Sequence, residues 1–427
     1  MARQVDSQSR LLLDLEGVAI RLWDRIIFPD TTWRIREGQQ WAVLGPNASG
    51  KTALARAICG ELPFSAGRVR RNVGRDGYDG IGFVSFELHQ HLMARDAAKD
   101  LSRFASGNVY SLTTAGDTIR EGLAEPDPVH LDWVTELFEI GELLDRPLRV
   151  LSNGESRKTL IARALMRKPE LLILDEPFDG LDAASQHRLE AVLGELIRTG
   201  LHVVLITHRQ DELIPEISHV LCVKECMVLC QGSRRDVLTP DTLEGLYGPE
   251  EEDRHTGKKE GGNGKDEREP IIEFRNVSVR YGDTLALDSL DWTVRRGENW
   301  AIQGPNGSGK TTLISLVYAD NLQAYANDIR LFGKARGSGE SIWEIKQRIG
   351  LVSPHLQAGY RLEMGVFDVV VSGFFDSTGL YRRPTEEQKA AAWRWIQRLG
   401  IGYLRERIFS QLSYGERRLA IIVRALV

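Results

Sequence analysis

The sequence has few cysteines, no long apolar run and no apolar leader at its start. Four cysteines in 427 residues cannot form a dense disulfide framework. The longest apolar stretches, such as residues 201–207 and 366–375, fall well short of the roughly 18 to 20 residues that a membrane span requires. The first ten residues lack the apolar core of a secretory signal. We therefore expect a cytoplasmic protein, at most peripheral at the inner face of the plasma membrane.

The sequence also lacks an excess of charge of one sign. Its 55 basic and 60 acidic residues leave a net charge of -5, and no basic stripe stands out along the chain. This balance gives no overall field that would concentrate nucleic acid. No specific nucleic-acid partner is therefore predicted, and any ligand must be recognised by local sites.

What the sequence does contain is a long internal repeat. Residues 41–52, WAVLGPNASGKT, align without a gap with residues 300–311, WAIQGPNGSGKT. Further along each copy, residues 151–155 match residues 412–416 in the same order. At roughly 150 residues per domain, the chain is long enough for two or three domains. We therefore expect two homologous units.

The two units are separated by a segment without apolar periodicity. It reads GPEEEDRHTGKKEGGNGKDEREP, with charges of both signs interspersed with glycine. Such a segment cannot bury enough apolar surface to fold, and its mixed charge favours a solvated tether over a binding tail. We expect a first domain over residues 1–247, a flexible linker over residues 248–270 and a second domain over residues 271–427.

Apolar strands alternate with helices in the first unit. Residues 11–22 have the alternating pattern of a strand, and the apolar residues 41–44 run into a glycine loop and a helix. Two more apolar strands are predicted over residues 171–174 and 203–207, with a helix over residues 184–198 between them. This order predicts an α/β core with a buried parallel sheet. The second unit is expected to begin in the same way, with strands over residues 271–281 and 300–303.

Both glycine loops fit the pattern G-x-x-x-x-G-K-T of a phosphate-binding loop. The glycines let backbone amides turn toward phosphates, and the helix that follows presents its positive N-terminus. The lysine would reach the β and γ phosphates of ATP, and the threonine would bind Mg²⁺. The predicted ATP-binding residues are Gly45, Pro46, Asn47, Ala48, Ser49, Gly50, Lys51 and Thr52 in the first unit, and Gly304, Pro305, Asn306, Gly307, Ser308, Gly309, Lys310, Thr311 and Thr312 in the second.

An acidic pair follows the apolar strand at residues 171–174. We interpret Asp175 as the carboxylate on the metal side and Glu176 as the general base that polarises the attacking water. A helix cap or a solvated turn is the alternative for acidic residues at a strand end, and it suits Asp179 and Asp182 better. The predicted magnesium ligands are Thr52, Asp175 and Thr311.

Two further motifs are of the kind that bind phosphate groups or lie at a ligand site. His208 follows the strand at residues 203–207, so it would emerge at the carboxyl edge, where open α/β sheets hold ligands. The pattern Leu-Ser-x-Gly-Glu occurs at residues 151–155 and 412–416, each time before a basic helix. A serine and a glycine at a helix start make a second anion-binding N-terminus.

Three cysteines at intervals of four allow two interpretations. Cys222, Cys226 and Cys230 would suit zinc ligation, but no fourth ligand stands at a recognisable spacing. Alternating apolar residues over 219–232 instead favour a β-hairpin that turns at residues 224–227. We therefore prefer buried structural thiols.

Together these motifs resemble those of ABC-type nucleotide-binding domains over nearly the whole chain. Phosphate loop, signature, Asp-Glu strand, residues 180–182 and His208 occur in the family's order. The resemblance implies two P-loop NTPase domains of the α/β class. Each would have a mainly parallel core sheet, an antiparallel β subdomain and a helical subdomain. It also implies ATP hydrolysis with ATP and Mg²⁺ bound and with Glu176 and His208 as catalytic residues.

The resemblance further implies that the two domains pair head to tail around two ATP molecules. Each phosphate loop would face the signature of the other domain. Ser413 and Gly415 would then complete the first ATP site, and Ser152 and Gly154 would complete the second.

At one position the two units differ from each other, and at another position both units depart from the family. Tyr281 resembles the aromatic residue that stacks on adenine, whereas the first unit has Leu22 at that position, with Trp23 adjacent. Phe86 and Pro354 replace the family's glutamine, which couples ATP to a membrane domain. A membrane permease is therefore disfavoured as a partner.

The second unit reaches only 11 residues past Glu416, before any second Asp-Glu strand. Because a parallel sheet without a central strand would leave backbone groups unpaired, we expect this domain to be incomplete and the natural protein to continue for roughly 50 to 70 residues. Within the family, the fused pair resembles molybdenum transport ATP-binding and photorepair proteins, which implies a link to molybdate-type transport. The alternative is a ribosome-acting or DNA-repair ABC ATPase without a membrane partner.

Overall fold

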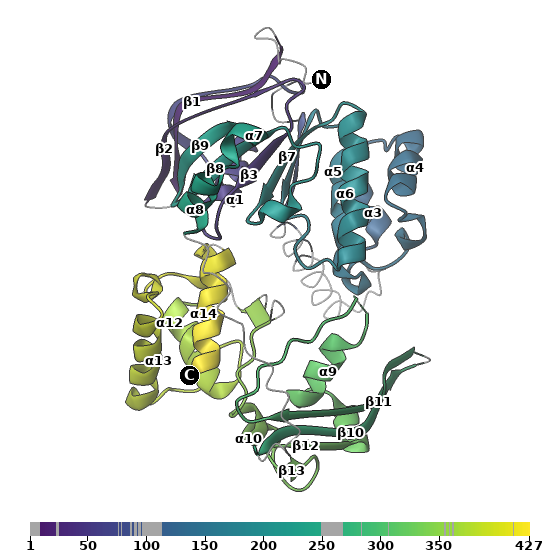
Figure 1. Cartoon of the computed structure of the whole chain (residues 1–427), viewed down its shortest axis with the longest axis vertical. Coiled ribbons are helices and arrows are strands. Elements are labelled where there is room, and N and C mark those ends of the chain that lie inside the picture. Colours follow the sequence, from purple (N-terminus) through teal and green to yellow (C-terminus); the bar gives the residue numbers. More distant parts are fainter. Residues whose placement is uncertain are drawn as a thin grey trace. The chain divides into compact units, whose positions relative to one another are not determined.

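The structure, a computed structural model, divides into two compact units, Met1–Arg254 and His255–Val427, and each is described separately (Figure 1). It describes all residues except 1–8, 23–24, 76, 78, 86–87, 89–91, 93–94, 96–112, 249–267, 283, 306, 354–355, 358, 361–362 and 413. Predicted residues outside the described part are Trp23, Phe86, Asn306, Pro354, Ser413 and most of the linker.

Unit 1 begins with an antiparallel sheet. The strands β1 (Leu11–Leu22), β2 (Arg25–Arg36) and β4 (Phe64–Arg71) pair in the order β2-β1-β4. Apolar side chains of β1 and β2 pack with the helix α1 (Lys51–Ile58) in one hydrophobic core. The predicted strand at residues 11–22 is therefore confirmed, with the same bounds.

A six-stranded sheet forms the centre of unit 1, in the order β5-β6-β7-β3-β8-β9. Five of these strands are parallel, and β9 runs antiparallel to β8. Successive residues of the inner strands alternate between two hydrophobic cores, one on each face of the sheet. This confirms the predicted buried parallel sheet. The strands are β3 (Trp41–Leu44), β5 (Ile81–Val84), β6 (Leu171–Asp175), β7 (His202–Thr207), β8 (His219–Lys224) and β9 (Met227–Ser233).

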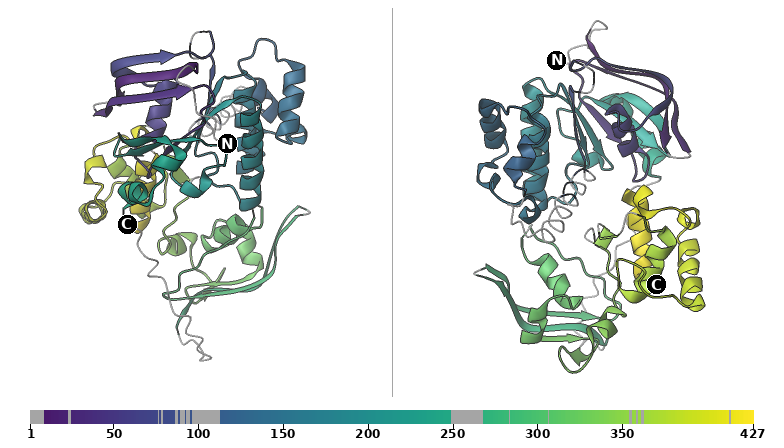
Figure 2. Two further views of the ribbon diagram at one scale, coloured as in Figure 1. Left: turned by 45° about the horizontal axis from the view of Figure 1, so that its top comes forward. Right: turned by 180° about the vertical axis from the view of Figure 1, so that it is seen from behind.

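Helices α3, α4, α5 and α6 lie together on the side of unit 1 away from the antiparallel sheet (Figures 1 and 2). The helix α5 packs against α3 and α4, and α6 confirms the helix predicted over residues 184–198. No described helix of either unit is long and apolar enough to cross a membrane. The helices are α3 (Ala115–Arg120), α4 (Pro128–Leu137), α5 (Asn153–Leu165), α6 (Ala183–Arg198), α7 (Arg234–Val237) and α8 (Pro240–Tyr247), with 3-10 turns at Gly141–Leu143, Leu148–Val150 and Gln210–Glu212.

The cysteine-containing hairpin has the predicted form. Cys222 of β8 lies opposite Cys230 of β9, and Cys226 lies in the turn between the strands. Cys222 is fully buried, and the other two are half-buried. Among the described residues, no group of three or more His, Cys, Asp or Glu side chains is placed to hold a metal ion.

Unit 2 has an antiparallel sheet and a helical region, each with its own hydrophobic core. The sheet order is β11-β10-β12-β13, and Figure 2 shows α9 beside this sheet and α12, α13 and α14 together. The elements are β10 (Pro270–Tyr281), β11 (Thr284–Arg295), α9 (Lys310–Val317), β12 (Asp328–Leu331), β13 (Lys334–Ala335), α10 (Ile342–Lys346), α12 (Val366–Val371), α13 (Glu386–Arg398) and α14 (Tyr414–Leu426), with 3-10 turns at Leu322–Ala326, Ser372–Phe375, Gly402–Leu404 and Phe409–Gln411.

The strand predicted over residues 300–303 is wrong, because this segment has no strand structure. Its counterpart β3 is held between β7 and β8, which are formed by residues that follow α5. In unit 2, no described segment takes the place of those two neighbours. A strand of four residues needs neighbours on both sides to bury its backbone groups.

Candidate functional site

The first phosphate loop connects β3 to α1 and is closely packed on both sides. A Cβ atom on Gly45 would lie 2.0 Å from the carbonyl oxygen of Val223 in β8, so only glycine fits there. Gly50 has a φ of +93°, and a Cβ atom on it would lie 2.9 Å from the Phe28 ring. Close packing therefore fixes the path of the loop between the strand and the helix.

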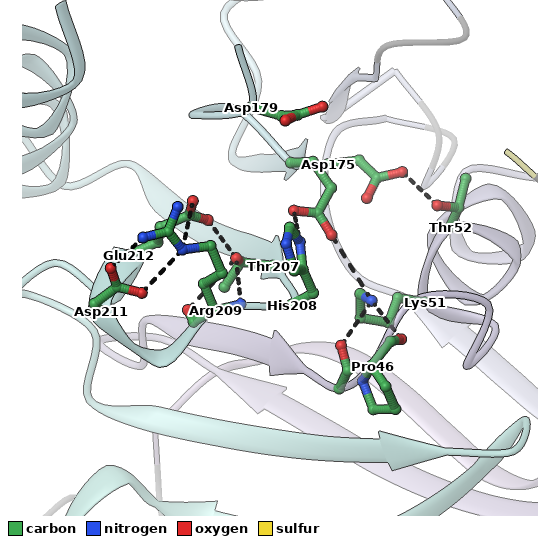
Figure 3. Close-up of polar contacts among 12 residues, drawn as sticks. Pro46, Lys51, Thr52, Asp175, Asp179, Thr207, His208, Arg209, Asp211 and Glu212 are labelled. Atoms are coloured by element: carbon green, nitrogen blue, oxygen red, sulfur yellow. Dashed lines mark hydrogen bonds and ion pairs between the residues drawn. The ribbon is translucent and has the colours of Figure 1, made fainter. Parts of the chain in front are cut away.

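Lys51 is the first residue of α1, and its side chain is buried. Its Nζ atom donates hydrogen bonds to the carbonyl oxygens of Gly45 and Pro46 at 2.9 and 3.0 Å (Figure 3). The same atom lies 3.7 Å from Oε1 of Glu176. Burial lowers the pKa of Lys51, and the negative charge of Glu176 opposes that shift. The lysine thus joins the loop to the end of β6.

Thr52 and Asp175 meet beside the loop. The Thr52 hydroxyl donates a hydrogen bond to Oδ2 of Asp175 at 2.6 Å (Figure 3). Asp175 is buried at the carboxyl end of β6. Hydroxyl and carboxylate oxygens are the hard ligands that Mg²⁺ prefers. These two residues therefore fit a magnesium ion that is held by few protein ligands and several waters.

Glu176 follows β6 and contacts the predicted switch histidine. Its Oε2 atom lies 2.9 Å from Nδ1 of His208, and its backbone has a left-handed φ of +48°. A non-glycine residue in this conformation is uncommon and is often found at functional sites. The hydrogen bond to Glu176 raises the pKa of His208, although partial burial opposes that shift. The carboxylate thus lies between a lysine and a histidine.

Three residues that the sequence did not single out, Thr207, Glu212 and Tyr247, lie near His208. The buried Glu212 accepts a hydrogen bond from Thr207, and burial raises the pKa of this glutamate. The Tyr247 hydroxyl, at the end of α8, donates a hydrogen bond to the backbone carbonyl of His208 at 2.9 Å. Neither the burial of Glu212 nor the approach of α8 leaves a local signal in the sequence.

The first signature motif forms the start of α5, as predicted. Ser152 is the N-cap, and its hydroxyl accepts a hydrogen bond from the Glu155 amide at 3.3 Å. Glu155 in turn accepts one from the Ser152 amide at 2.7 Å. This reciprocal pair is a capping box, which explains the glutamate of the motif. In unit 2, Gly415 lies in the first turn of α14.

The second phosphate loop is closed by its lysine in the same way as the first. Lys310 begins α9 and donates hydrogen bonds to the carbonyl oxygens of Gly304 and Pro305 at 2.8 and 2.7 Å. These bonds are exposed to solvent, and Lys310 forms no ion pair with any described residue. Thr311 is exposed and Thr312 is half-buried. Within the described part of unit 2, the second loop therefore has the lysine closure of a phosphate site but no carboxylate ion-paired to that lysine.

Tyr281 lies at the end of β10 with about half of its surface exposed. Its hydroxyl accepts a hydrogen bond from Nδ2 of Asn321 at 2.8 Å. Leu22, at the corresponding position of unit 1, instead packs against the core of the antiparallel sheet. An exposed ring is therefore available for stacking in unit 2.

Comparison with known families agrees with this geometry. The family model described as ABC transporter matches residues 28–179 and 287–427. These ranges contain both phosphate loops and both signature motifs. The chain belongs to the ABC transporter family of ATP-binding proteins. As a member of this ABC family, it is an ATPase that binds and hydrolyses ATP, and the family generally uses ATP together with Mg²⁺.

Similar ABC proteins occur in bacteria and fungi. The ABC transporter ATP-binding protein ModF of Escherichia coli is 38% identical over 404 residues, which cover 92% of this chain and 80% of ModF. An uncharacterized ABC transporter ATP-binding protein of Schizosaccharomyces pombe is 28% identical over 413 residues, with coverages of 94% and 83%. Among solved structures, cbiO1 of Clostridium perfringens, part of the ABC transporter complex cbiONQ, is 24% identical with a TM-score of 0.44 and covers 55% of this chain and 93% of that chain.

Proposed function

We propose that unit 1 binds ATP on residues 45–52 and hydrolyses it with Glu176 as the general base. The observation that carries this proposal is the position of the Glu176 carboxylate. It lies 3.7 Å from Nζ of Lys51 and 2.9 Å from Nδ1 of His208. These two contacts hold the carboxylate beside the phosphate loop, where it would face the attacking water.

In the proposed reaction, a water oxygen attacks the γ-phosphorus, and Glu176 accepts a proton from that water. The bond between the γ-phosphorus and the bridging oxygen breaks, which gives ADP and phosphate. His208 holds the carboxylate through its Nδ1 atom, and Lys51 exchanges its carbonyl partners for phosphate oxygens. Thr52 and Asp175 would hold Mg²⁺, which would supply positive charge to the phosphate oxygens.

We infer that the second unit contributes to the first ATP site. Both units carry a phosphate loop and a signature motif, so a head-to-tail pair would contain two composite sites. Ser413 and Gly415 would then contact the ATP of unit 1, and Ser152 and Gly154 would contact the ATP of unit 2.

A link between hydrolysis and molybdate-type transport is supported by the resemblance to molybdenum transport ATP-binding proteins. Phe86 and Pro354, which replace the family's coupling glutamine, disfavour direct coupling to a permease. Purification from native membranes distinguishes a transport ATPase from an ATPase without a membrane partner. A permease that co-purifies in equal amounts and stimulates hydrolysis supports transport. Activity that is insensitive to lipid and permease supports an ATPase without a membrane partner.

The test of the catalytic proposal is Glu176→Gln in the full chain. We expect ATP binding to persist and single-turnover hydrolysis to fall by about 10² or more, because a general base contributes roughly 10² to 10⁴. Glu136→Gln, on the exposed face of α4, is the control and should keep the normal rate. A Glu176→Gln rate within a factor of about three of wild type would place the base elsewhere.

A further inference from the structure

The signature helix α5 carries a buried cation that the proposed mechanism does not use. Arg157 lies five residues after the N-cap Ser152, and only 7% of its surface is exposed. Its Nη2 atom donates a hydrogen bond to the backbone carbonyl of Asp179 at 3.3 Å. Its Nη1 atom is buried and has no hydrogen-bond partner among the described residues. A guanidinium in such a place needs an explanation, because buried charges are normally fully paired.

The negative charges of three carboxylates act on this guanidinium. Burial lowers the pKa of Arg157, and the negative charges of Asp179, Asp175 and Glu176 oppose that shift, in this order of importance. Because arginine stays protonated in proteins, a fixed positive charge lies beside the carboxylates at the end of β6. Two of these carboxylates are the proposed metal ligand and the proposed general base.

The first turn of α5 also packs against the loop that follows Glu176. A Cβ atom on Gly154 would lie 3.6 Å from Cδ2 of Leu181, and one on Gly180 would lie 3.6 Å from Nδ2 of Asn153. The start of α5 therefore lies close to this loop, and the hydrogen bond from Arg157 to Asp179 connects the two. A displacement of α5 would therefore strain this hydrogen bond.

We propose that Arg157 is a positioning residue that couples the start of α5 to the catalytic carboxylates of unit 1. The hydrogen bond to Asp179 fixes the loop after Glu176, and the guanidinium charge holds the Glu176 carboxylate in place. This proposal rests on the proposed function, in which Ser152 and Gly154 contact the ATP of unit 2. One rigid helix would then contact one ATP at its N-terminus and control hydrolysis of the other through Arg157.

The first experiment compares three variants of the full chain, measured by steady-state ATP hydrolysis. Arg157→Met removes the charge and the hydrogen bond, whereas Arg157→Lys keeps a charge. Arg163→Met is the matched control, because Arg163 is partly buried on the same helix but pairs with Glu121 at 3.3 Å.

We expect Arg157→Met to lower kcat about tenfold, because small displacements of catalytic groups have effects of this order or larger. The KM for ATP should stay within about twofold, since the phosphate loop is untouched. Arg157→Lys should recover part of kcat, and Arg163→Met should leave kcat within about twofold. Equal losses in Arg157→Met and Arg163→Met, or a raised KM with normal kcat, would overturn the positioning role. If Arg157→Met does not fold, Arg157→Lys takes its place in the comparison with Arg163→Met. A lower kcat with an unchanged KM then supports the positioning role, and an equal kcat or a raised KM overturns it.

The second experiment tests the coupling with a double-mutant cycle. Lys310→Ala weakens the second phosphate loop, so it should slow hydrolysis in the otherwise unchanged chain. In the Arg157→Met background, Lys310→Ala should cause no further loss. Additive losses, or no loss from Lys310→Ala alone, would overturn the coupling. The rate of Glu176→Gln tests the general base independently, so a failed coupling and a failed catalytic proposal give different results.

Discussion

The two repeats share a phosphate-loop sequence, yet only one of them has the strand in front of it. In unit 1, Trp41 and Val43 of β3 are 4% and 1% exposed. The corresponding Trp300 and Ile302 of unit 2 are 54% and 36% exposed. Both loops are nevertheless closed by a lysine that donates to two loop carbonyls. Local sequence therefore determines the loop, whereas the strand depends on distant partners.

The largest expected difference between the units is in folding stability. Val43→Asp places a charge in the core, so unit 1 should lose about 4 kcal/mol or more, a large part of the roughly 5 to 15 kcal/mol of a domain. The matched variant Ile302→Asp should change the stability of unit 2 by less than about 1 kcal/mol. Urea unfolding followed by hydrogen exchange of each unit measures both values. Equal losses would show that residues 300–303 are buried in a strand after all.

The second difference concerns the two lysines. Lys51→Ala should weaken ATP binding to unit 1 by about 10², because hydrogen bonds to charged groups contribute roughly 1.5 to 3 kcal/mol each. Lys310→Ala should weaken binding to unit 2 by less than about tenfold, because water screens the half-buried lysine, whose hydrogen bonds are exposed. Photolabelling with an ATP analogue, with the label assigned to its unit by mass spectrometry, measures each affinity. Unchanged labelling of unit 1 in Lys51→Ala would contradict the ATP site there.

The third difference is the pair of His208 and Glu176, for which the described part of unit 2 has no counterpart. Because folding raises the pKa of His208, the pair stabilises unit 1 fully below the unfolded pKa of about 6.5. This contribution is lost as the pH rises through the folded pKa.

The Tm of wild type should therefore exceed that of His208→Gln by a few degrees near pH 6. This difference should shrink as the pH rises toward about 9. Thermal unfolding at both pH values measures it. His187→Gln, at an exposed histidine of α6, is the control. A difference that grows with pH would mean that the histidine is held neutral.

The smallest difference lies within the loops themselves. Ala48 has a left-handed φ of +63°, and the corresponding Gly307 has a φ of +82°. Ala48→Gly should stabilise unit 1 by about 0.5 kcal/mol. The steric strain that a left-handed alanine loses is slightly larger than the conformational entropy that a glycine gives up on folding. Gly307→Ala should destabilise unit 2 by about the same amount. Urea unfolding of both variants measures the two changes in the free energy of unfolding. Changes of the same sign would mean that the two loops have different backbone conformations.

Sequence predicted the parts of the site that are encoded locally. Lys51, Thr52, Asp175 and Glu176 lie in short motifs next to apolar strands, and the structure brings them together with His208. These motifs are readable because a strand end and a glycine loop need particular residues at fixed spacing.

Other features depend on tertiary packing and were missed. Arg157 is one basic residue among several on its helix, and only the fold shows that it is buried and bonded to the loop at Asp179. The arginine-rich strand β4 has no alternating apolar pattern, yet it pairs with β1 at the edge of the antiparallel sheet. The segment 300–303 has the apolar pattern of a strand, but no strand in the described part of unit 2 pairs with it.

The dependence of β3 on β7 and β8 also sets an order in time during synthesis. β3 ends at residue 44, whereas β7 begins at residue 202 and β8 ends at residue 224. At about 5 to 20 residues per second, a ribosome needs roughly ten to thirty seconds to make the chain between β3 and β7. The β1–β2 hairpin can form within microseconds of its emergence. On the ribosome, the antiparallel sheet is thus an early structure, and anchoring of the first phosphate loop is among the last events in the folding of unit 1.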